Sequence, residues 1–304
     1  MGLMPRIAVV GSANLDLVVR APRFPEPGET LLGGTFSTHP GGKGANGAVA
    51  AGRLRASVSF VGMLGRDSFG EALANSLAEA GVDLTHTLRA DATATGVAQI
   101  TVDDDGRNTI VVAPGANALL TSDDVSHALE AIAPTVTLAS LEIPLEAVEA
   151  CVGRSGFFIV NPAPAADLPE DLFPKINLFT PNQTEVLYYT GIEASDDASC
   201  LEAAGKLFDR GLRRVVITLC GRGCFLATPE AGRYIPNLEV RAVDTTGAGD
   251  AFNGALAAFL AEGRNIENAL ALANCVGALA CTRSGAQDSM PTLAELREVA
   301  GELL

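Results

Sequence analysis

The chain has 304 residues, of which 48% are hydrophobic and 5% aromatic, and it contains no tryptophan. That length is enough for one large domain or two modest ones, with a core of mostly aliphatic side chains. The formal net charge of −15 disfavours a surface that binds nucleic acid or an anionic membrane.

No apolar run approaches the roughly 20 residues that span a bilayer. Residues 1–6 lack the basic and then apolar layout of a secretory signal. We therefore expect a soluble, cytoplasmic protein with small-molecule partners and with neither nucleic acid nor membrane among them. The cysteines form no CxxC pair and no zinc-ligand spacing, which predicts reduced, buried thiols at Cys151, Cys200, Cys220, Cys224, Cys275 and Cys281.

The first hundred residues carry both strand and helix patterns. Short apolar or alternating segments predict strands at residues 6–10, 15–20, 29–38 and 58–61. A turn-rich segment, 21–28, separates the second of these strands from the third. Helices are predicted at residues 45–54, after a glycine-rich start, and at residues 69–80, where Gly81 is a plausible C-cap.

The rest of the chain mostly alternates between strand and helix. Residues 96–102 and 107–112 flank Asp-Asp-Asp-Gly, a strong hairpin signal. Helix-like stretches such as 201–210 then separate four apolar strands, predicted at residues 136–141, 157–161, 176–180 and 215–219. This alternation predicts a mostly parallel sheet with helices on both faces.

Two segments break the alternation and predict a second unit. Residues 15–38 and 95–113 lack intervening helices, so we expect them to form one small antiparallel sheet assembled from two insertions. The expected division is therefore an α/β core at residues 1–14, 39–94 and 114–304, with a β-sheet lid at residues 15–38 and 95–113.

The glycine-rich stretch 39–46, His-Pro-Gly-Gly-Lys-Gly-Ala-Asn, resembles a phosphate-binding loop but is not a Walker A motif. That motif needs glycine at position 37 and serine or threonine at position 44, where this chain has Ser37 and Gly44. The glycines would instead let the backbone approach a ligand closely. Asn46 would offer a polyol both a donor and an acceptor. The alternative is a glycine turn that only caps a helix.

Asn14 and Asp16 follow the first strand at alternate positions of an extended segment. In a strand these two side chains point the same way. A carboxylate beside an amide suits the hydroxyl groups of a sugar. The alternative, of equal weight for this segment alone, is an Asx turn that ends the strand.

Two more polar segments follow predicted strands, at the sheet edge where open α/β proteins bind ligands. Asn182 can cap a helix, with Glu185 completing a capping-box spacing. Alternatively, this pair organises Mg²⁺ and its waters near phosphates. The segment 218–223 would admit a nucleotide or form a plain turn. A GxGxxG fingerprint is absent, which disfavours a dehydrogenase.

The stretch 244–250, Asp-Thr-Thr-Gly-Ala-Gly-Asp, precedes a predicted helix at residues 251–263. A helix start carries unpaired N–H groups and the positive end of the macrodipole, so it binds anions. Asp250 places a carboxylate beside that site. Phosphoryl transfer to a hydroxyl needs donors for the phosphate charge and a base for the proton. Taken alone, however, such a stretch is more often a helix cap.

Together these segments resemble the ribokinase family of carbohydrate kinases, of the PfkB type, from end to end. The specific pieces are residues 11–16, 41–46, 61–70, 180–185 and 244–250, and the pieces most similar to the ribokinase branch are 114–118 and 282–287. The resemblance implies a three-layer α/β domain with a mostly parallel sheet and a small β-sheet lid. It implies transfer of the γ-phosphoryl group of ATP to the 5-hydroxyl of D-ribose, and a homodimer formed through the lid.

The resemblance also assigns roles to residues and adds Mg²⁺ and an activating K⁺ to ATP. The catalytic positions are the base Asp250 and the anion-hole amides of Gly247, Ala248, Gly249 and Asp250. The sugar positions, besides Asp250, are Asn14, Asp16, Gly42, Lys43, Asn46 and Glu142. The nucleotide positions, with Glu185 also holding Mg²⁺ through water, are Asn182, Glu185, Thr218, Gly221, Gly223, Gly249 and Asn274. The K⁺ positions, mostly through carbonyl groups, are Asp244, Thr246, Ala280, Arg283, Gly285 and Ser289.

Two positions depart from the family pattern. Cys220 stands where glycine is frequent, and a positive φ there would strain a cysteine. Gly47 replaces a polar residue that usually follows the Gly-Lys-Gly-Ala-Asn run. The contact of Lys43 stays open between a phosphate and a nearby carboxylate. Alternatives to ribose are deoxyribose, another furanose and an adenosine-like nucleoside, and a non-catalytic sugar-binding homologue is the alternative of another class.

Overall fold

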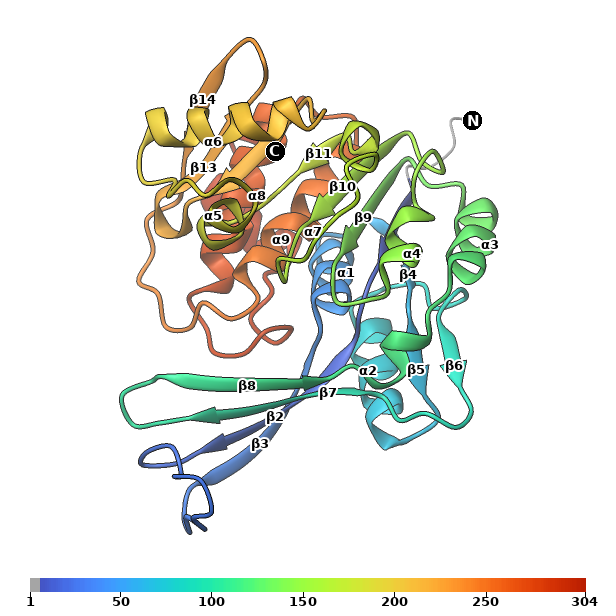
Figure 1. The fold of residues 1–304 in the computed structure, drawn as a ribbon, viewed down its shortest axis with the longest axis vertical. Helices are drawn as coiled ribbons and strands as arrows, with labels where there is room; N and C mark the ends of the chain where they lie inside the picture. The colour runs from blue at the N-terminus through green and yellow to red at the C-terminus, as the bar shows by residue number, and fades with distance from the viewer. Residues whose placement is uncertain (1–5) are drawn as a thin grey trace.

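Eight strands form the larger sheet of the computed structural model, which describes residues 6–304 (Figure 1). Their order is β14-β13-β12-β11-β10-β9-β1-β4. Six of them run parallel: β1 (Arg6–Val10), β4 (Ser57–Val61), β9 (Val136–Ser140), β10 (Phe157–Asn161), β11 (Leu178–Phe179) and β12 (Val215–Thr218). Two antiparallel strands, which the sequence did not predict, extend one edge: β13 (Gly223–Ala227) and β14 (Gly232–Pro236). The mostly parallel sheet is therefore confirmed.

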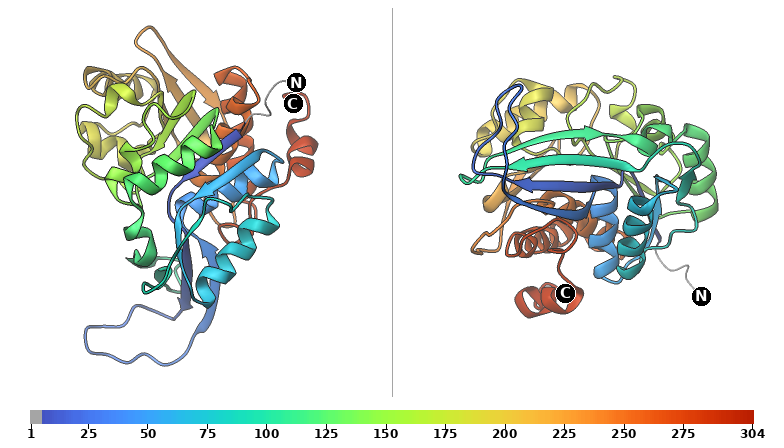
Figure 2. Two further views of the ribbon diagram at one scale, coloured as in Figure 1. Left: turned by 90° about the vertical axis from the view of Figure 1, so that its right-hand side faces the viewer. Right: turned by 90° about the horizontal axis from the view of Figure 1, so that it is seen from below.

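Helices cover both faces of this sheet, which confirms the three-layer fold (Figure 2). One layer holds α1 (Lys43–Arg53), α2 (Ser68–Glu79), α7 (Ala248–Ala261), α8 (Ile266–Ala280) and α9 (Leu293–Ala300). The other layer holds α3 (Ser122–Ile132), α4 (Leu145–Glu149), α5 (Gln183–Thr190) and α6 (Asp197–Asp209). Alternate residues of β1 enter the two cores, Ile7 and Val9 on one side and Ala8 and Val10 on the other.

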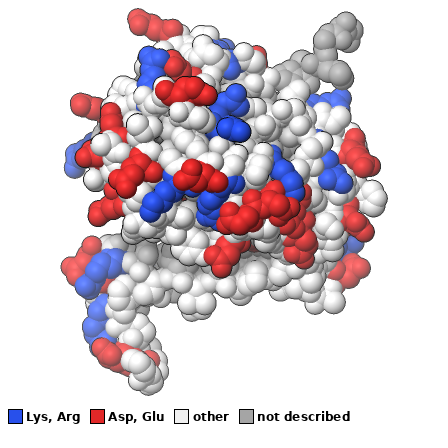
Figure 3. Space-filling view, turned by 45° about the horizontal axis from the view of Figure 1, so that its top comes forward, with Lys and Arg blue, Asp and Glu red and all other residues white. Residues whose placement is uncertain are grey.

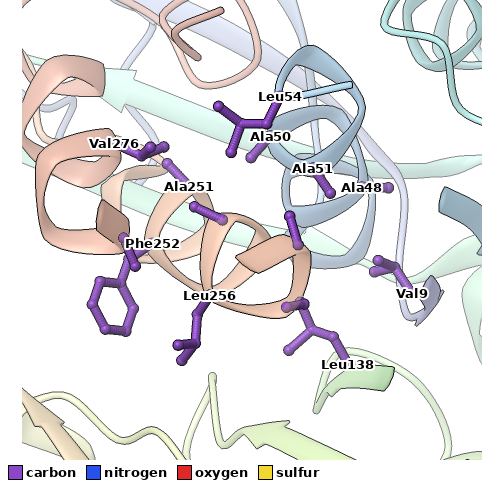
Figure 4. Packing of buried hydrophobic residues seen from close by; sticks show 14 of the residues in the cluster. Val9, Ala48, Ala50, Ala51, Leu54, Leu138, Ala251, Phe252, Leu256 and Val276 are labelled. Atoms are coloured by element: carbon purple, nitrogen blue, oxygen red, sulfur yellow. The ribbon is translucent and has the colours of Figure 1, made fainter. Parts of the chain in front are cut away.

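The contact between α1 and α7 matters most for the site. Small side chains line it, including Ala50, Ala51 and Ala251 (Figure 4). The approach is so close that a Cβ added to Gly254 of α7 would lie 2.2 Å from the carbonyl oxygen of Gly47 in α1. Two distant parts of the chain therefore start their helices side by side.

Four strands form a smaller sheet that projects from the larger one (Figures 1 and 2). In spatial order they are β3 (Thr35–Gly41), β2 (Asn14–Arg20), β7 (Gly96–Val102) and β8 (Asn108–Ala113). The expectation of a wholly antiparallel sheet was wrong, because the central strands β2 and β7 pair in parallel. The hairpin of β7 and β8 is confirmed. The division into core and lid stays a prediction, and its residues 1–5 lie outside the described residues.

Several predicted boundaries also differ from the structure. The strand predicted at residues 29–38 begins six residues later, because Gly33 and Gly34 have φ of +107° and +108°, which no strand accommodates. Helix α7 begins at Ala248 rather than residue 251, so Asp250 lies inside its first turn. The remaining elements are short: β5 (Met63–Gly65), β6 (Leu88–Ala90), and 3₁₀ turns at Gly115–Leu119, Phe173–Lys175 and Cys220–Arg222.

The cysteines are free thiols, and Cys151, Cys200, Cys224 and Cys275 are buried as predicted. Cys281 is half-buried, and Cys220 is exposed because its loop borders an open cavity. No helix within residues 6–304 is long and apolar enough to cross a membrane. On the face shown in Figure 3, acidic and basic side chains are interspersed.

Candidate active site

Most of the polar side chains predicted to bind a sugar lie together where the two sheets meet. Asp16 comes from β2, Lys43 from the start of α1, Glu142 from the segment after β9, and Asp250 from the first turn of α7. Their charges affect one another's pKa: Asp250, Glu142 and Asp16 all raise that of Lys43. A single polar centre is therefore assembled from four distant segments.

Asp250 is the most buried acid of this centre, with a relative exposure of 7%. One oxygen of its carboxylate, Oδ2, accepts a hydrogen bond of 2.8 Å from the Asn46 side-chain nitrogen. Burial raises the pKa of Asp250, while Lys43 and the bond from Asn46 lower it. A raised pKa favours proton acceptance, so Asp250 has the character of a general base.

The start of α7 has the features of an anion site. Gly247, the N-cap residue, has φ of +75° and no capping side chain. The Ala248 N–H donates to the Thr245 carbonyl, but those of Gly247, Gly249 and Asp250 have no acceptor in the described part of the chain. Three of the four predicted amides thus remain free for an anion at the positive end of the helix.

The glycine-rich stretch brings the start of α1 against the start of β2, where Asn14 lies. Gly42, the N-cap of α1, has φ of +88°, and a Cβ there would lie 2.6 Å from the Asn14 backbone nitrogen. Asn46 follows in the first turn of α1, and its Oδ1 atom is buried without a hydrogen-bond partner. An orphaned acceptor is costly unless a ligand donor reaches it. The helix-capping and ligand-binding interpretations of this stretch are thus compatible.

Three residues absent from the predicted site support it. The Asn117 side-chain nitrogen donates to Asn14 Oδ1 at 2.8 Å, and its oxygen accepts from the Ala13 N–H at 3.0 Å. The Ser12 hydroxyl donates to Glu142 Oε2, which also accepts from the Lys43 N–H at 3.1 Å. Ser140, on β9, lies buried near Asp250. Asn117 lies inside the quoted segment 114–118 and Ser12 inside the quoted segment 11–16, whereas Ser140 had no sequence signal.

Asp16 is destabilised as an anion before any ligand binds. Burial, with the charges of Glu142 and Asp250, raises its pKa from 3.8 to about 7, and Lys43 opposes the shift. Above pH 7 the folded chain must keep this carboxyl group charged in its buried, negatively charged surroundings. The group therefore lowers the free energy of unfolding at that pH. Below pH 3.8 it is protonated in both states and has no effect.

Asp16→Asn should therefore make the protein more stable at high pH. We expect the free energy of unfolding to rise by about 1–2 kcal/mol at pH 8 and by clearly less at pH 5. Urea denaturation at both pH values measures the difference. The control is Asp104→Asn, in the exposed hairpin turn. An equal gain at both pH values would contradict the shifted pKa.

A cavity of about 630 Å³ opens beside the start of α7. It reaches Ala248 and Gly249, and six predicted nucleotide positions line it: Asn182, Thr218, Gly221, Gly223, Gly249 and Asn274. The segment 237–242, which the sequence did not single out, forms another wall. This volume lies in the range of ordinary small-molecule sites.

Three of the predicted nucleotide positions also stabilise the local structure around them. Asn182 and Glu185 form the predicted capping box of α5, and Glu185 does not line the cavity. The Asn274 side chain donates to the carbonyl oxygens of Ile235 and Pro236 and so fixes the end of β14. Cys220 has φ of +53°, the strained conformation considered from sequence.

Five of the six predicted K⁺ positions fall in two adjoining loops, and the sixth, Ala280, is the last residue of α8. Asp244 accepts hydrogen bonds from the Thr246 N–H and hydroxyl and from the Gly285 N–H. The Arg283 guanidinium donates to the Ser289 carbonyl at 3.2 Å. Within residues 6–304 no three His, Cys, Asp or Glu side chains form a metal-binding group. The donors available to a cation here are one carboxylate, a hydroxyl and backbone carbonyls.

Comparisons with known proteins agree with this geometry. A family model described as pfkB family carbohydrate kinase matches residues 4–293. The chain is 40% identical to a ribokinase of Haemophilus influenzae over 297 residues, covering 96% of this chain and 97% of the relative. It superposes on a Thermotoga maritima ribokinase with a TM-score of 0.88 at 34% identity, covering 97% and 99% of the two chains. An Arabidopsis thaliana ribokinase complexed with ribose and ATP also gives 0.88, at 29% identity and coverage of 97% and 98%.

Proposed function

The chain belongs to the pfkB family of carbohydrate kinases, and we propose that it transfers the γ-phosphoryl group of ATP to the 5-hydroxyl of D-ribose, giving D-ribose 5-phosphate. Ribokinase relatives at about 40% identity over nearly the whole chain support this activity. The observation that carries this proposal is the position of Asp250. It lies in the first turn of α7, beside both the sugar-side carboxylates and the end of the large cavity.

The mechanism follows from that position. A sugar hydroxyl beside Asp250 gives its proton to the buried carboxylate as its oxygen attacks the γ-phosphorus of ATP in line. The bond from that phosphorus to the bridging oxygen breaks, and ADP leaves. The free N–H groups of Gly249 and Asp250 stabilise the charge that spreads over the phosphoryl oxygens. Asn46 orients the base through Oδ2 and offers its orphaned Oδ1 to a hydroxyl of the sugar. Lys43, among carboxylates in the free protein, balances their charge.

We propose the two cations as well, on the donor sets that the chain offers. Glu185 is 6% exposed and lies close enough to Lys43 and Asp250 for their charges to affect its pKa, so it suits a Mg²⁺ held through water. The ion would neutralise phosphate charge. Asp244, the Thr246 hydroxyl and nearby carbonyls are the hard oxygen donors that suit K⁺. That ion would stiffen the loop before α7.

The smaller sheet supports the proposed lid and homodimer. Its strands leave large apolar side chains in solvent: Val19, Phe36, Ile110, Val111 and Val112. The strand register puts Val19, Phe36 and Val111 on one face of the sheet and Ile110 and Val112 on the other, and an apolar face of this kind marks a contact surface. A second copy of the sheet would cover one of these faces, and closure of the lid over Asp16 would exclude water from the reaction. A cytoplasmic location fits substrates of this kind.

An assay of ADP formation against a panel of sugars tests the activity. The panel contains ribose, 2-deoxyribose, other furanoses and adenosine, each with and without K⁺. We expect the highest kcat/KM with ribose and a gain on adding K⁺. A preference for deoxyribose or a nucleoside would move the assignment to that substrate, and no sugar-dependent ADP formation would eliminate the kinase.

A further inference from the structure

A second, far smaller cavity lies beside Asp250, within the layer between α1, α7 and the sheet. Its volume is about 10 Å³, and its lining includes Lys43, Gly47, Ser140, Asn161, Asp250 and Asn253. That volume is close to the space that one buried water needs. Val9, Gly44 and Leu138 complete the lining, so polar and apolar groups share it, which distinguishes this cavity from the wholly apolar voids that stay empty.

Ser140 supplies the unsatisfied group in this lining. It is 4% exposed, and its hydroxyl oxygen is buried without a hydrogen-bond partner. Asn253 is engaged elsewhere and gives Ser140 no hydrogen bond: its oxygen accepts from the Thr180 hydroxyl and its nitrogen donates to the Gly249 carbonyl. A hydroxyl left alone in the core is costly, whereas one water would satisfy it.

Gly47 explains why the space exists. A Cβ at this position would lie 3.3 Å from Leu138 Cδ2 and 3.8 Å from the Asp250 carbonyl oxygen. A side chain here would therefore extend into the cavity. The departure from the family pattern at position 47 thus coincides with a small cavity beside the proposed base.

We propose that the cavity holds one water molecule, which Ser140 anchors and which donates a hydrogen bond to the Asp250 carboxylate. Ser140 is then a positioning residue for the base. This inference rests on the proposed role of Asp250. The charged groups around that carboxylate are Lys43 from α1, Glu142 after β9, Asp16 from β2 and Glu185 from α5. The water adds a neutral donor that favours the charged form against burial.

A high-resolution crystal structure of the full chain tests the water directly, without any assumption about catalysis. Two variants test its role: Ser140→Ala removes the anchor, and Gly47→Ala fills the space. The matched control is Thr137→Val, on the same strand. Thr137 also has a buried, unpartnered hydroxyl, but it lies outside the cavity lining.

We expect density for one water in the parent protein and none at that place in either variant. Losing a donor to the carboxylate raises its pKa, so the acid limb of kcat should move up by about one pH unit. On the acid limb, at a fixed pH below the pKa of the base, kcat should therefore fall about tenfold with KM for ATP unchanged, and the double variant should lose no more than either single one. The Thr137→Val control should match the parent.

Two results would overturn the proposal. One is an empty cavity with the Ser140 hydroxyl bonded to protein. The other is a water whose loss leaves the acid limb in place. In either case a large loss of kcat in Asp250→Asn keeps the proposed function intact. Near-normal turnover in Asp250→Asn removes the base itself, and then the bound water has no catalytic role.

Discussion

Asp250→Asn should lower kcat by about 10²–10⁴-fold and leave ribose affinity nearly unchanged. Asparagine has the shape of aspartate, and its side-chain oxygen can still accept the bond from Asn46 that Asp250 accepts at 2.8 Å. What it loses is the capacity to take a proton from the attacking hydroxyl. Steady-state ADP formation and calorimetric titration with ribose measure the two quantities separately.

The control for this variant is Asp197→Asn, at the exposed start of α6. It removes the same charge from the first turn of another helix and should leave kcat unchanged. A variant at position 250 with near-normal turnover would contradict the assignment of the base. A parallel loss of ribose binding and turnover would instead give Asp250 a binding role.

Local sequence signals were reliable where one segment determines its own structure. The capping box at Asn182 and Glu185, the hairpin after residue 96 and the buried strands at residues 6–10 and 157–161 all appear as predicted. Each depends on side-chain spacing within a few residues. The sequence also predicted the edge of the sheet at which the functional segments gather, since parallel strands have their carboxyl ends at the same edge.

Such local signals could not predict contacts between distant segments. The bond from Asn46 to Asp250 joins residues 204 positions apart, whose helices pack closely where Gly47 meets Gly254. The cavity wall at residues 237–242 has no motif, and its place depends on how β14 joins the sheet edge. Asn117 supports Asn14 from a turn, Gly115–Leu119, that packs against β5, β6 and β7.

Gly42→Ala should damage the sugar side of the site through both backbone strain and a steric clash. The backbone at Gly42 has φ of +88°, which costs an L-residue about 1–2 kcal/mol. The new Cβ would also lie 2.6 Å from the Asn14 nitrogen and 2.7 Å from the Ala13 Cα, both backbone atoms that no rotamer change can move. We expect a total loss of about 2–4 kcal/mol in the free energy of unfolding.

The functional loss should be larger, because the displaced segment leads into β2, which carries Asn14 and Asp16. A shift of about 1 Å in groups that orient a substrate costs about 100-fold, so kcat/KM for ribose should fall at least that far. Gly81→Ala separates strain from displacement: Gly81 has φ of +81°, but a Cβ there meets nothing within 4 Å. This control should lose about 1–2 kcal/mol of stability and keep full activity. If the close contact were unimportant, Gly42→Ala would instead match Gly81→Ala. The same result for both variants in urea denaturation and in ribose kinetics would therefore show that the close contact between the start of α1 and the start of β2 does not determine the geometry of the sugar site.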